Sequence, residues 1–312
     1  MNNIPIIIDV DTGTDDAIAL ICALQMPKLL DIKAITTVMG NVEIEKTSKN
    51  TIDLTSLLDH DVKVAIGASK PLKKNHERAI IHGNSGLGDV VLPDSNKTFY
   101  LKSSADTIYE EALRCNGELQ LLAIGPLTNV ALAIQQYPKL TSLIKNITIM
   151  GGCLIGGNMT QASEFNIYND PEAAKIVFNS GIPVTMVGLD VTLKPTLPEW
   201  VYNEINNLHT KYSNISISIF DFMNKMEMEY SGGYANLHDV IALCALTTND
   251  IITYEQYYID VECEGTITRG MTVADFNNVY PKKKSNVNAA VNININSFWN
   301  WLISIYKGDF YE

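Results

Sequence analysis

The sequence lacks any apolar run that approaches the roughly 18 residues a membrane-spanning helix needs. It also lacks the pattern of a secretory signal, because the apolar run at 4–8 is too short and no basic region precedes it. Its five cysteines are odd in number, widely spaced and without a CxxC pair, which disfavours disulfide and zinc frameworks. We therefore expect a cytoplasmic protein that has no membrane partner.

Positive charge is also scarce. Lysine and arginine number 23 against 35 acidic residues, for a net charge of -12, and the basic residues form only short patches. A surface of this sign repels phosphate backbones, so the sequence argues against a nucleic-acid partner. With 46% hydrophobic and 19% charged residues, 312 residues, no internal repeat and no linker-like segment, we expect one globular domain over 1–312.

Short β-branched apolar runs alternate with segments of helical periodicity, which predicts an α/β fold with a mostly parallel central sheet flanked by helices, a Rossmann-like arrangement. The expected strands are 4–8, 32–38, 62–66, 119–124, 147–150, 184–187, 257–261 and a half-exposed strand at 287–295. The expected helices are 15–26, 42–58, 105–114, 127–136, 171–179, 199–208, 213–228 and 298–306, with Ser297 as the N-cap of the last. The irregular segment 67–103 is long enough to cover a site.

Four carboxylates follow the first strand within eight residues: Asp9, Asp11, Asp15 and Asp16. Acids in the first turn of a helix interact favourably with its dipole, which by itself explains two of them. Four so close together repel one another unless a cation or a shared proton relieves them. The local donors are all hard oxygens, which select Ca²⁺ or Mg²⁺, and the carboxyl end of a parallel strand is where open α/β sheets bind ligands.

A set of motifs spread along the chain resembles the nucleoside hydrolases, enzymes that cleave the N-glycosidic bond of ribonucleosides. These motifs are Asp9-Val-Asp-Thr-Gly-Thr-Asp-Asp16, Thr36-Thr-Val-Met-Gly-Asn41, His82-Gly-Asn-Ser-Gly-Leu-Gly88, Gly125-Pro-Leu-Thr-Asn129, Met150-Gly-Gly152, Ala162-Ser-Glu-Phe-Asn166, Asp170-Pro-Glu-Ala-Ala174, Gly188-Leu-Asp190 and His238-Asp239. The resemblance implies the nucleoside hydrolase fold and a homo-oligomer, either a dimer or a tetramer.

Carried over residue by residue, the resemblance implies a Ca²⁺ cofactor and a ribose site. The metal ligands would be Asp11, Asp16, Asp239 and the backbone carbonyl of Ile124. The implied substrate-binding residues are Asp15, Asn41, Met150, Asn158, Glu164, Phe165 and Asn166, while Asp9 would orient the loop. The chemistry fits these residue types, because a metal-positioned water needs a base and Asp11 can accept its proton. Glycosidic cleavage also passes through an oxocarbenium-like state, which a negative field stabilises.

Two histidines bear on the base. His238 precedes an implied metal ligand and is the candidate to protonate the leaving base, while His82 lies in the long loop and is a candidate base contact. Tyr230 and Tyr234 could flank the base or pack against a helix. Purine-specific relatives resemble one another in having a stacking Trp at the position of His82. Because the tryptophans here have helix-packing patterns, the resemblance favours uridine or cytidine, with inosine as a further candidate.

Thr12 stands where many relatives have Pro, which should loosen the turn without touching a ligand. Two alternatives stay open. One is a Mg²⁺-dependent phosphatase of the haloacid-dehalogenase type with Asp9 as nucleophile, which would need a basic phosphate clamp that the sequence does not offer. The other is a non-catalytic, Ca²⁺-dependent nucleoside-binding protein on the same fold.

Overall fold

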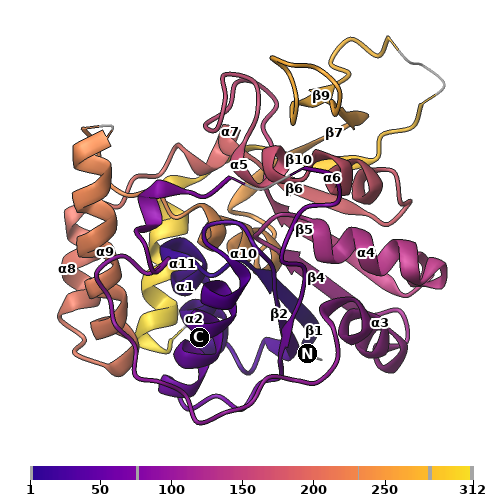
Figure 1. Cartoon of the computed structure of the whole chain (residues 1–312). Helices are drawn as coiled ribbons and strands as arrows, with labels where there is room; N and C mark the ends of the chain where they lie inside the picture. Colours follow the sequence, from indigo (N-terminus) through magenta and orange to yellow (C-terminus); the bar gives the residue numbers. More distant parts are fainter. Residues whose placement is uncertain (1–2, 75–76, 231, 280–282, 310–312) are drawn as a thin grey trace.

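The first strand, β1 (Ile4–Val10), lies in the middle of the sheet. The structure, a computed structural model, describes residues 3–74, 77–230, 232–279 and 283–309. Side chains alternate along β1, so that Ile6 and Ile8 enter the apolar core on one face and Ile7 enters the core on the other. A strand that is apolar on both faces is stable only where helices cover both sides of the sheet, which is the arrangement in Figure 1.

The sheet has eight strands in the order β3-β2-β1-β4-β5-β6-β10-β7, and every neighbouring pair is parallel except β10 with β7. The chain proceeds outward from β1 through β2 and β3, and then continues from β4 on the other side. The other strands are β2 (Leu30–Thr37), β3 (Val64–Ile66), β4 (Leu119–Ala123), β5 (Ile144–Met150), β6 (Val184–Val187), β7 (Ile252–Tyr257) and β10 (Val287–Ile293). Ligands bind in open α/β sheets where the strand order reverses in this way, beyond the carboxyl ends.

Helices cover both faces of the sheet (Figure 1). One face packs against α1 (Thr14–Leu24), α2 (Ile44–Leu57), α8 (Glu199–Asn206), α9 (Lys211–Tyr230), α10 (His238–Thr247) and α11 (Ile295–Lys307). The other packs against α3 (Ser104–Cys115), α4 (Thr128–Gln136) and α6 (Pro171–Phe178). No helix in the described ranges is both long and apolar enough to cross a membrane. The expected α/β class with its mostly parallel sheet is confirmed.

Two sequence expectations need correction. The expected strand 257–261 is divided between two sheets: β7 ends at Tyr257, and Ile259 begins β8 (Ile259–Val261), which pairs with β9 (Thr272–Ala274). The side chain of Asn286 bonds both the N–H and the carbonyl of Ile259, in place of a continued strand. The N-cap of α11 is Asn294, whose side chain accepts a hydrogen bond from the backbone N–H of Ser297, the residue expected to be the cap.

Helix α10 was not among the expected helices, because its residues 239–244 are all buried and no polar face alternates with an apolar one. Short elements also went unpredicted, because one or two turns give little periodicity. They are η1 (Ile80–His82), η2 (Pro138–Ser142), α5 (Phe165–Asn169), α7 (Leu189–Thr192) and β9. In the strand expected to be half-exposed, only Asn288 and Val291 are half-buried and only Asn292 is exposed. The other residues of β10 are buried, because β10 lies inside the sheet. All five cysteines are free, as the sequence predicts.

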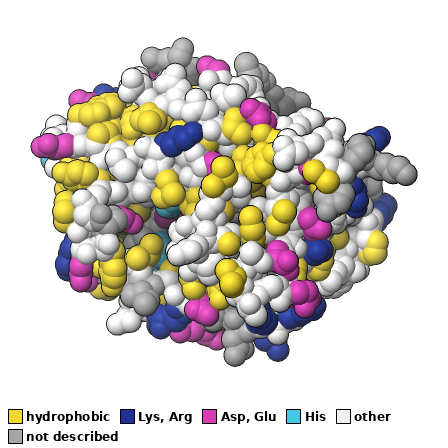
Figure 2. Space-filling model, turned by 90° about the horizontal axis from the view of Figure 1, so that it is seen from above, with side chains coloured by type: hydrophobic (Ala, Val, Ile, Leu, Met, Phe, Trp, Pro, Cys, Tyr) yellow, Lys and Arg dark blue, Asp and Glu magenta, His cyan; other side chains and the backbone are white. Residues whose placement is uncertain are grey.

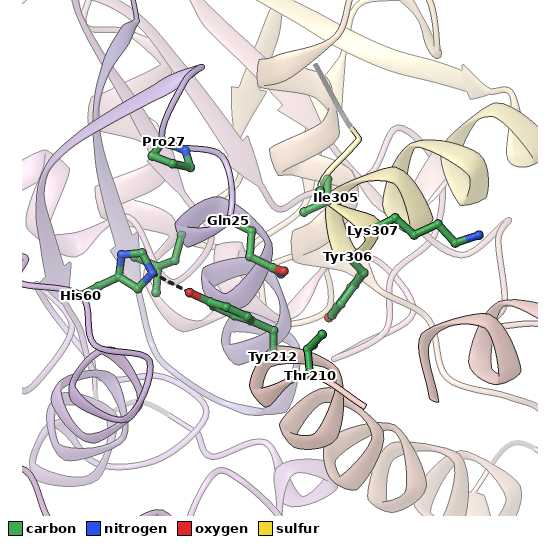
Figure 3. A pocket seen from close by; sticks show the side chains of 10 residues that line it. Gln25, Pro27, His60, Thr210, Tyr212, Ile305, Tyr306 and Lys307 are labelled. Carbon is green, nitrogen blue, oxygen red and sulfur yellow. Dashed lines mark hydrogen bonds between the residues drawn. The ribbon is translucent and has the colours of Figure 1, made fainter. Parts of the chain in front are cut away.

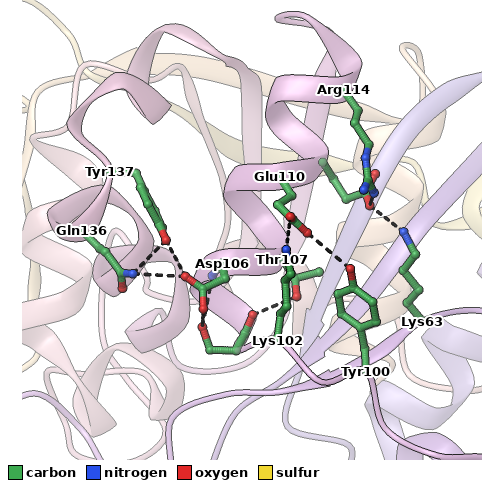
Figure 4. Close-up of polar contacts among 11 residues, drawn as sticks. Lys63, Tyr100, Lys102, Asp106, Thr107, Glu110, Arg114, Gln136 and Tyr137 are labelled. Carbon is green, nitrogen blue, oxygen red and sulfur yellow. Dashed lines mark hydrogen bonds and ion pairs between the residues drawn. The ribbon is translucent and has the colours of Figure 1, made fainter.

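The short edge strand β3 is paired on its outer side at one point, by a bridge between Ala65 and Tyr100. Charged side chains gather beside it (Figure 4). Lys63 donates to the buried carboxylate of Glu111 at 2.7 Å, and Arg114 pairs with the same carboxylate. Such charges discourage another chain from pairing with an edge strand. The charged side chains beside β3 therefore have a structural role, and we do not assign them to a binding site.

Candidate active site

The carboxyl end of β1 and the first turn of α1 hold four carboxylates, each no more than 5% exposed: Asp9, Asp11, Asp15 and Asp16. Asp16 shapes the turn between them, because it accepts hydrogen bonds from the backbone N–H groups of Asp11 and Gly13, both at 3.0 Å. Gly13 is required by close approach, since a Cβ there would lie 2.6 Å from Asn41 Nδ2. The turn can therefore pack directly against the loop after β2.

Asn41, in the loop after β2, fastens this turn. Its backbone N–H donates to Asp11 Oδ2 at 2.7 Å, and its side-chain amide donates to Asp16 Oδ2 at 3.0 Å and to the Asp11 carbonyl at 3.2 Å. Both amide protons of Asn41 are thus engaged within the protein. Only its side-chain oxygen is left to accept a bond from a sugar hydroxyl.

Asp239 reaches the same place from the far end of the chain. It lies in the first turn of α10, and its backbone N–H donates to Asp15 Oδ2 at 3.1 Å. Helices α1 and α10 pack against each other, so both N-termini approach the carboxylates. The positive ends of two helix dipoles favour negative charge there.

These carboxylates are buried and their negative charges repel one another, which raises pKa values in the cluster. Burial, and then repulsion from Asp16, raises the pKa of Asp11 and that of Asp15 well above the ordinary value, although bonds from the backbone of α10 oppose the rise at Asp15. Burial and repulsion from the other acids of the cluster raise the pKa of Asp239 in the same way. Within the described ranges, three oxygens of this cluster are buried without a hydrogen-bond partner: Asp9 Oδ2, Asp11 Oδ1 and Asp15 Oδ1. Such atoms are costly to bury and call for a ligand.

The donor set suits a hard cation in its chemistry. Besides the carboxylates, the carbonyl of Ile124 follows β4 at this edge and accepts one bond from Asn166 Nδ2 at 2.9 Å, which leaves a second lone pair. Carboxylate and carbonyl oxygens are the ligands that Ca²⁺ prefers. In the part of the chain that the structure describes, however, no three His, Cys, Asp or Glu side chains converge closely enough to hold a metal ion. The residues fit Ca²⁺ in kind, and a complete coordination geometry is not preformed.

Asn166 and Glu164 complete the edge beyond β5. The second amide proton of Asn166 goes to the carbonyl of Met150, at 3.1 Å, and Met150 itself is buried at the end of β5. Glu164 caps α5, accepting from the backbone N–H groups of Gly152, Asn166 and Ile167 at 2.9 to 3.1 Å. Burial outweighs these bonds and raises the pKa of Glu164 to about 7. Both residues lie at the site, with most of their hydrogen-bonding capacity already used.

The remaining implied ribose contacts, Asn158 and Phe165, lie in and after the loop that precedes α5. Asn158 is exposed, and its side-chain oxygen accepts from the backbone N–H of Phe165 at 3.0 Å. The contact of both residues with a sugar stays a prediction.

His82 is brought to the site, as its motif suggests. Its Nδ1 accepts the backbone N–H of Thr14 at 3.2 Å and lies 2.7 Å from the Thr14 hydroxyl. Because a backbone N–H can only donate, Nδ1 is unprotonated and Nε2 carries the proton of the neutral ring. Burial, and then the nearby imidazole of His238, lowers the pKa of His82 to about 4. The ring is therefore neutral near pH 7 and presents a donor.

His238 begins α10, and its Nδ1 lies 2.8 Å from the hydroxyl of Thr192 in α7. Burial lowers the pKa of His238 to about 4. A group with this pKa is neutral near pH 7, so the free protein does not supply a ready imidazolium. A neutral imidazole can still donate a hydrogen bond to a leaving base.

The aromatic side chains considered for the base are exposed, whereas His82 is buried and His238 is partly buried. Tyr230 ends α9 and is 61% exposed, and Tyr234 is 54% exposed, so neither is packed in the core and a role beside the base stays a prediction. Trp299 and Trp301 pack in α11, as expected, but Trp200 on α8 is 47% exposed. His60 lies apart from the site, and its Nε2 is 3.0 Å from the hydroxyl of Tyr212.

Asp9 has the structural environment that the resemblance implies. Its Oδ1 accepts from Asn129 Nδ2 at 2.8 Å and from the hydroxyl of Thr36, and burial raises its pKa to about 7. Asn129 also donates to the Thr37 carbonyl and accepts from the Ala68 N–H at 2.8 Å. Asn129 thereby ties three strand ends together. Sequence reasoning quoted it only within a motif, and its place after a strand was the available signal.

Two hollows can be compared. Figure 2 looks onto the edge where the strands end and shows a hollow with acidic and histidine side chains inside it. Another hollow, of about 380 Å³, lies where α1 and α11 end, at the opposite edge of the sheet (Figure 3). Its lining is Leu24, Gln25, Pro27, His60, Thr210, Tyr212, Ile305, Tyr306, Lys307 and Gly308, without a carboxylate side chain. The chemistry-bearing residues therefore gather at the carboxyl edge.

Comparison with known proteins agrees with this geometry. The sequence model of the family described as inosine-uridine preferring nucleoside hydrolase matches residues 6–300. A relative from Escherichia coli, named pyrimidine-specific ribonucleoside hydrolase RihA, is 41% identical over 279 residues, covering 88% of this chain and 89% of the relative. A relative of the same name from Salmonella gallinarum is 39% identical over 298 residues, covering 94% of each chain.

A solved structure described as a purine-preferring ribonucleoside hydrolase from Gardnerella vaginalis has the same fold. It superposes with a TM-score of 0.91 at 33% identity and covers 99% of this chain and 100% of its own. The match over nearly the whole length contradicts the phosphatase alternative. The chain therefore belongs to the inosine-uridine preferring nucleoside hydrolase family, and it is a ribonucleoside hydrolase that cleaves N-glycosidic bonds.

Proposed function

We propose that this enzyme uses Ca²⁺ to hydrolyse uridine or cytidine, with inosine as a further substrate, to the free base and ribose. The observation that carries the calcium proposal is the pair of unpaired buried oxygens, Asp11 Oδ1 and Asp15 Oδ1, in a cluster of mutually repelling carboxylates. A divalent cation would relieve that repulsion. Asp11, Asp16, Asp239 and the Ile124 carbonyl would hold it.

Bound there, Ca²⁺ would orient a water molecule and the vicinal hydroxyls of the sugar. Asp11 Oδ2 is engaged by Asn41, whereas Asp11 Oδ1 is unpaired, so Oδ1 is the atom to accept the proton of the attacking water.

The other residues position the sugar and stabilise the charge that develops on it. Asp15, Glu164 and Asn166 offer oxygens to sugar hydroxyls at the carboxyl edge. The acidic cluster favours the positive charge of an oxocarbenium-like transition state. His238 would donate a hydrogen bond to the departing base as negative charge accumulates there.

The pyrimidine preference rests on His82 and on the relatives. His82 presents a neutral ring donor at the site instead of a large stacking indole. A relative named as pyrimidine-specific is 41% identical to this chain, whereas the solved relative described as purine-preferring is 33% identical. We therefore propose pyrimidine ribonucleosides as the better substrates.

We further propose that the reaction takes place in the cytoplasm, because the five free cysteines suit a reducing compartment. Assembly into a homo-oligomer stays a prediction. Ultracentrifugation of the purified protein measures it directly.

The experiment that tests the function is release of free base and reducing sugar from uridine, cytidine, inosine and adenosine, with and without a calcium chelator. We expect chelator-sensitive release that is fastest for the pyrimidines and is lost in Asp11→Ala. Release that survives the chelator would contradict the calcium proposal. Binding of nucleoside without release would point to the non-catalytic alternative.

A further inference from the structure

Helix α2 has a buried face that is polar. A helix that covers a sheet normally buries apolar residues. Here four hydroxyl side chains are each at most 1% exposed: Thr47, Ser48, Thr51 and Thr55. Buried hydroxyls need partners, and some of these reach outside the helix. This face lies against the turn after β1, which carries the carboxylates of the site.

Asn50, on the same helix, connects two loops that are far apart in sequence. Its Nδ2 lies 3.0 Å from the carbonyl of Thr12 and 2.9 Å from the carbonyl of Ser85. An amide group carries two protons, so it can donate to both carbonyls at once. Thr12 adjoins Asp11, and Ser85 follows His82 by three residues.

A second bond holds the Thr12 side of this connection. The Thr12 hydroxyl lies 2.7 Å from that of Thr51, and Thr51 itself donates to the Thr47 carbonyl at 2.8 Å. Since the proton of Thr51 is used, Thr12 is the donor. The Thr12 side chain thus adds a bond between this turn and α2, and the expectation that Thr in place of Pro loosens the turn stays a prediction.

The loop that follows His82 is held from the other side as well. A Cβ at Gly88, which has φ of +62°, would lie 2.2 Å from the ring of Phe222 on α9. A Cβ at Gly86, with φ of +90°, would lie 2.9 Å from Asn50 Nδ2. The backbone of this loop is therefore in direct contact with α2 and α9, and only glycine fits at these points.

We propose that Asn50 is a positioning residue that fixes His82 relative to the carboxylates, and so sets the affinity for the base without affecting the affinity for ribose. The inference rests on the proposed contact of His82 with the base. The Asn50 bridge supports the direct bond from Thr14 to His82 Nδ1 in joining the two halves of the binding site. The turn at Thr12 belongs to the ribose and metal side, and the loop at Ser85 to the base side. The remaining bonds of Asn41 and Asp16 keep the ribose side intact without Asn50.

The test compares wild type with Asn50→Asp, which has nearly the same shape but lacks both donors, and Asn50→Ala, which adds no charge. We expect KM for uridine to rise about tenfold in both variants, since two hydrogen bonds of ordinary strength are lost and part of that loss appears as loop displacement. The inhibition constant of free ribose should stay within about twofold.

The matched control is Lys49→Met, on the neighbouring position of the same helix. Lys49 pairs with Asp53 and Asp94, and neither belongs to the site. This variant should leave KM for uridine unchanged.

Hydrogen exchange supplies a measurement that does not depend on turnover. The N–H of Gly88 bonds the His82 carbonyl and the N–H of Val90 bonds the Leu87 carbonyl, so these amides report on the loop. We expect faster exchange over 79–90 in both Asn50 variants, with α11 unchanged. Unchanged exchange and KM, or equal losses of uridine and ribose affinity, would overturn the proposal. If wild type hydrolyses no nucleoside, the proposed function fails, and exchange over 79–90 still decides whether Asn50 positions the loop.

Discussion

Two buried clusters of charge in this molecule differ in how their charges are balanced. On the flank, Glu172 of α6 and Arg269 form a bidentate pair at 2.8 and 2.9 Å, with side chains only 10% and 9% exposed. At the carboxyl edge of the sheet, Asp11, Asp15 and Asp239 lie together without a basic partner in the described contacts, and two of their oxygens are unpaired. The flank cluster is complete within the chain, whereas the edge cluster is not.

The difference teaches how to separate structural charge from functional charge. A buried charge with its partner stabilises the fold mainly because removing one member leaves the other unpaired. Buried charges without partners destabilise the fold and are retained where a ligand supplies the compensation. The two clusters should therefore respond in opposite ways to substitution, to calcium and to pH.

The largest expected effect is on activity at the edge cluster. Asp11→Asn keeps the acceptor for Asn41 and replaces the unpaired oxygen by an uncharged amide. We expect kcat/KM for uridine to fall by about 10²- to 10⁴-fold, the usual contribution of a general base, while unfolding by urea in chelator is no easier than for wild type. A variant that loses stability and activity together would break the distinction between the two clusters.

Next in size is the effect on stability at the flank. Arg269→Met leaves the Glu172 carboxylate buried and unpaired, which should cost about 3–5 kcal/mol of unfolding free energy. Activity at low temperature should persist, because neither residue touches the site. The double variant Glu172→Leu with Arg269→Met should recover most of the loss, and failure to recover it would mean that the pair does more than balance its own charge.

Calcium should stabilise only the edge cluster. Ca²⁺ at about 100 times its dissociation constant is expected to add about 2.7 kcal/mol to the unfolding free energy of wild type. Differential scanning calorimetry should show the rise in Tm in wild type and in Arg269→Met, and its absence in Asp239→Asn. An equal rise in all three proteins would place the ion elsewhere.

The last expected difference is an opposite dependence of stability on pH at two glutamates, in calcium-free buffer. Burial raises the pKa of Glu164 from 4.5 to about 7, so its contribution to stability declines as pH rises from about 4.5 through 7. Burial alone would also raise the pKa of Glu172, but the bonds from Arg269 outweigh it and the pKa lies below 4.5. Its contribution is present above about pH 4.5 and is lost as pH falls. Urea titrations of Glu164→Gln and Glu172→Gln against wild type should show these slopes.

The sequence predicted what depends on local pattern. β1 and α1 were found because a β-branched run and a helical period adjoin the acids, and Asp239 and Ile124 were found through motifs. The single-turn elements and the division at Tyr258 were not predictable from periodicity. The division depends on Asn286, which is distant in sequence and occupies the hydrogen-bonding groups of Ile259.

Within the site, residue types were predictable but bonding states were not. The motif identified Asn41 as a site residue. The sequence could not show that its two amide protons donate to the Asp11 carbonyl and the Asp16 carboxylate. Asn50 gave no signal at all, because a polar residue on a helix is ordinarily exposed. Its role comes from two loops that only the folded sheet brings together.

The insertion of β10 between β6 and β7 has a consequence for synthesis on the ribosome. Until residues 287–293 emerge, β6 has no neighbour on its outer side and β7 has no partner in the sheet. A nascent chain that has already made Asp239 therefore still exposes an open strand edge, which invites association with other chains. Completion of the last strand, rather than of the active site, is the step that ends this exposure.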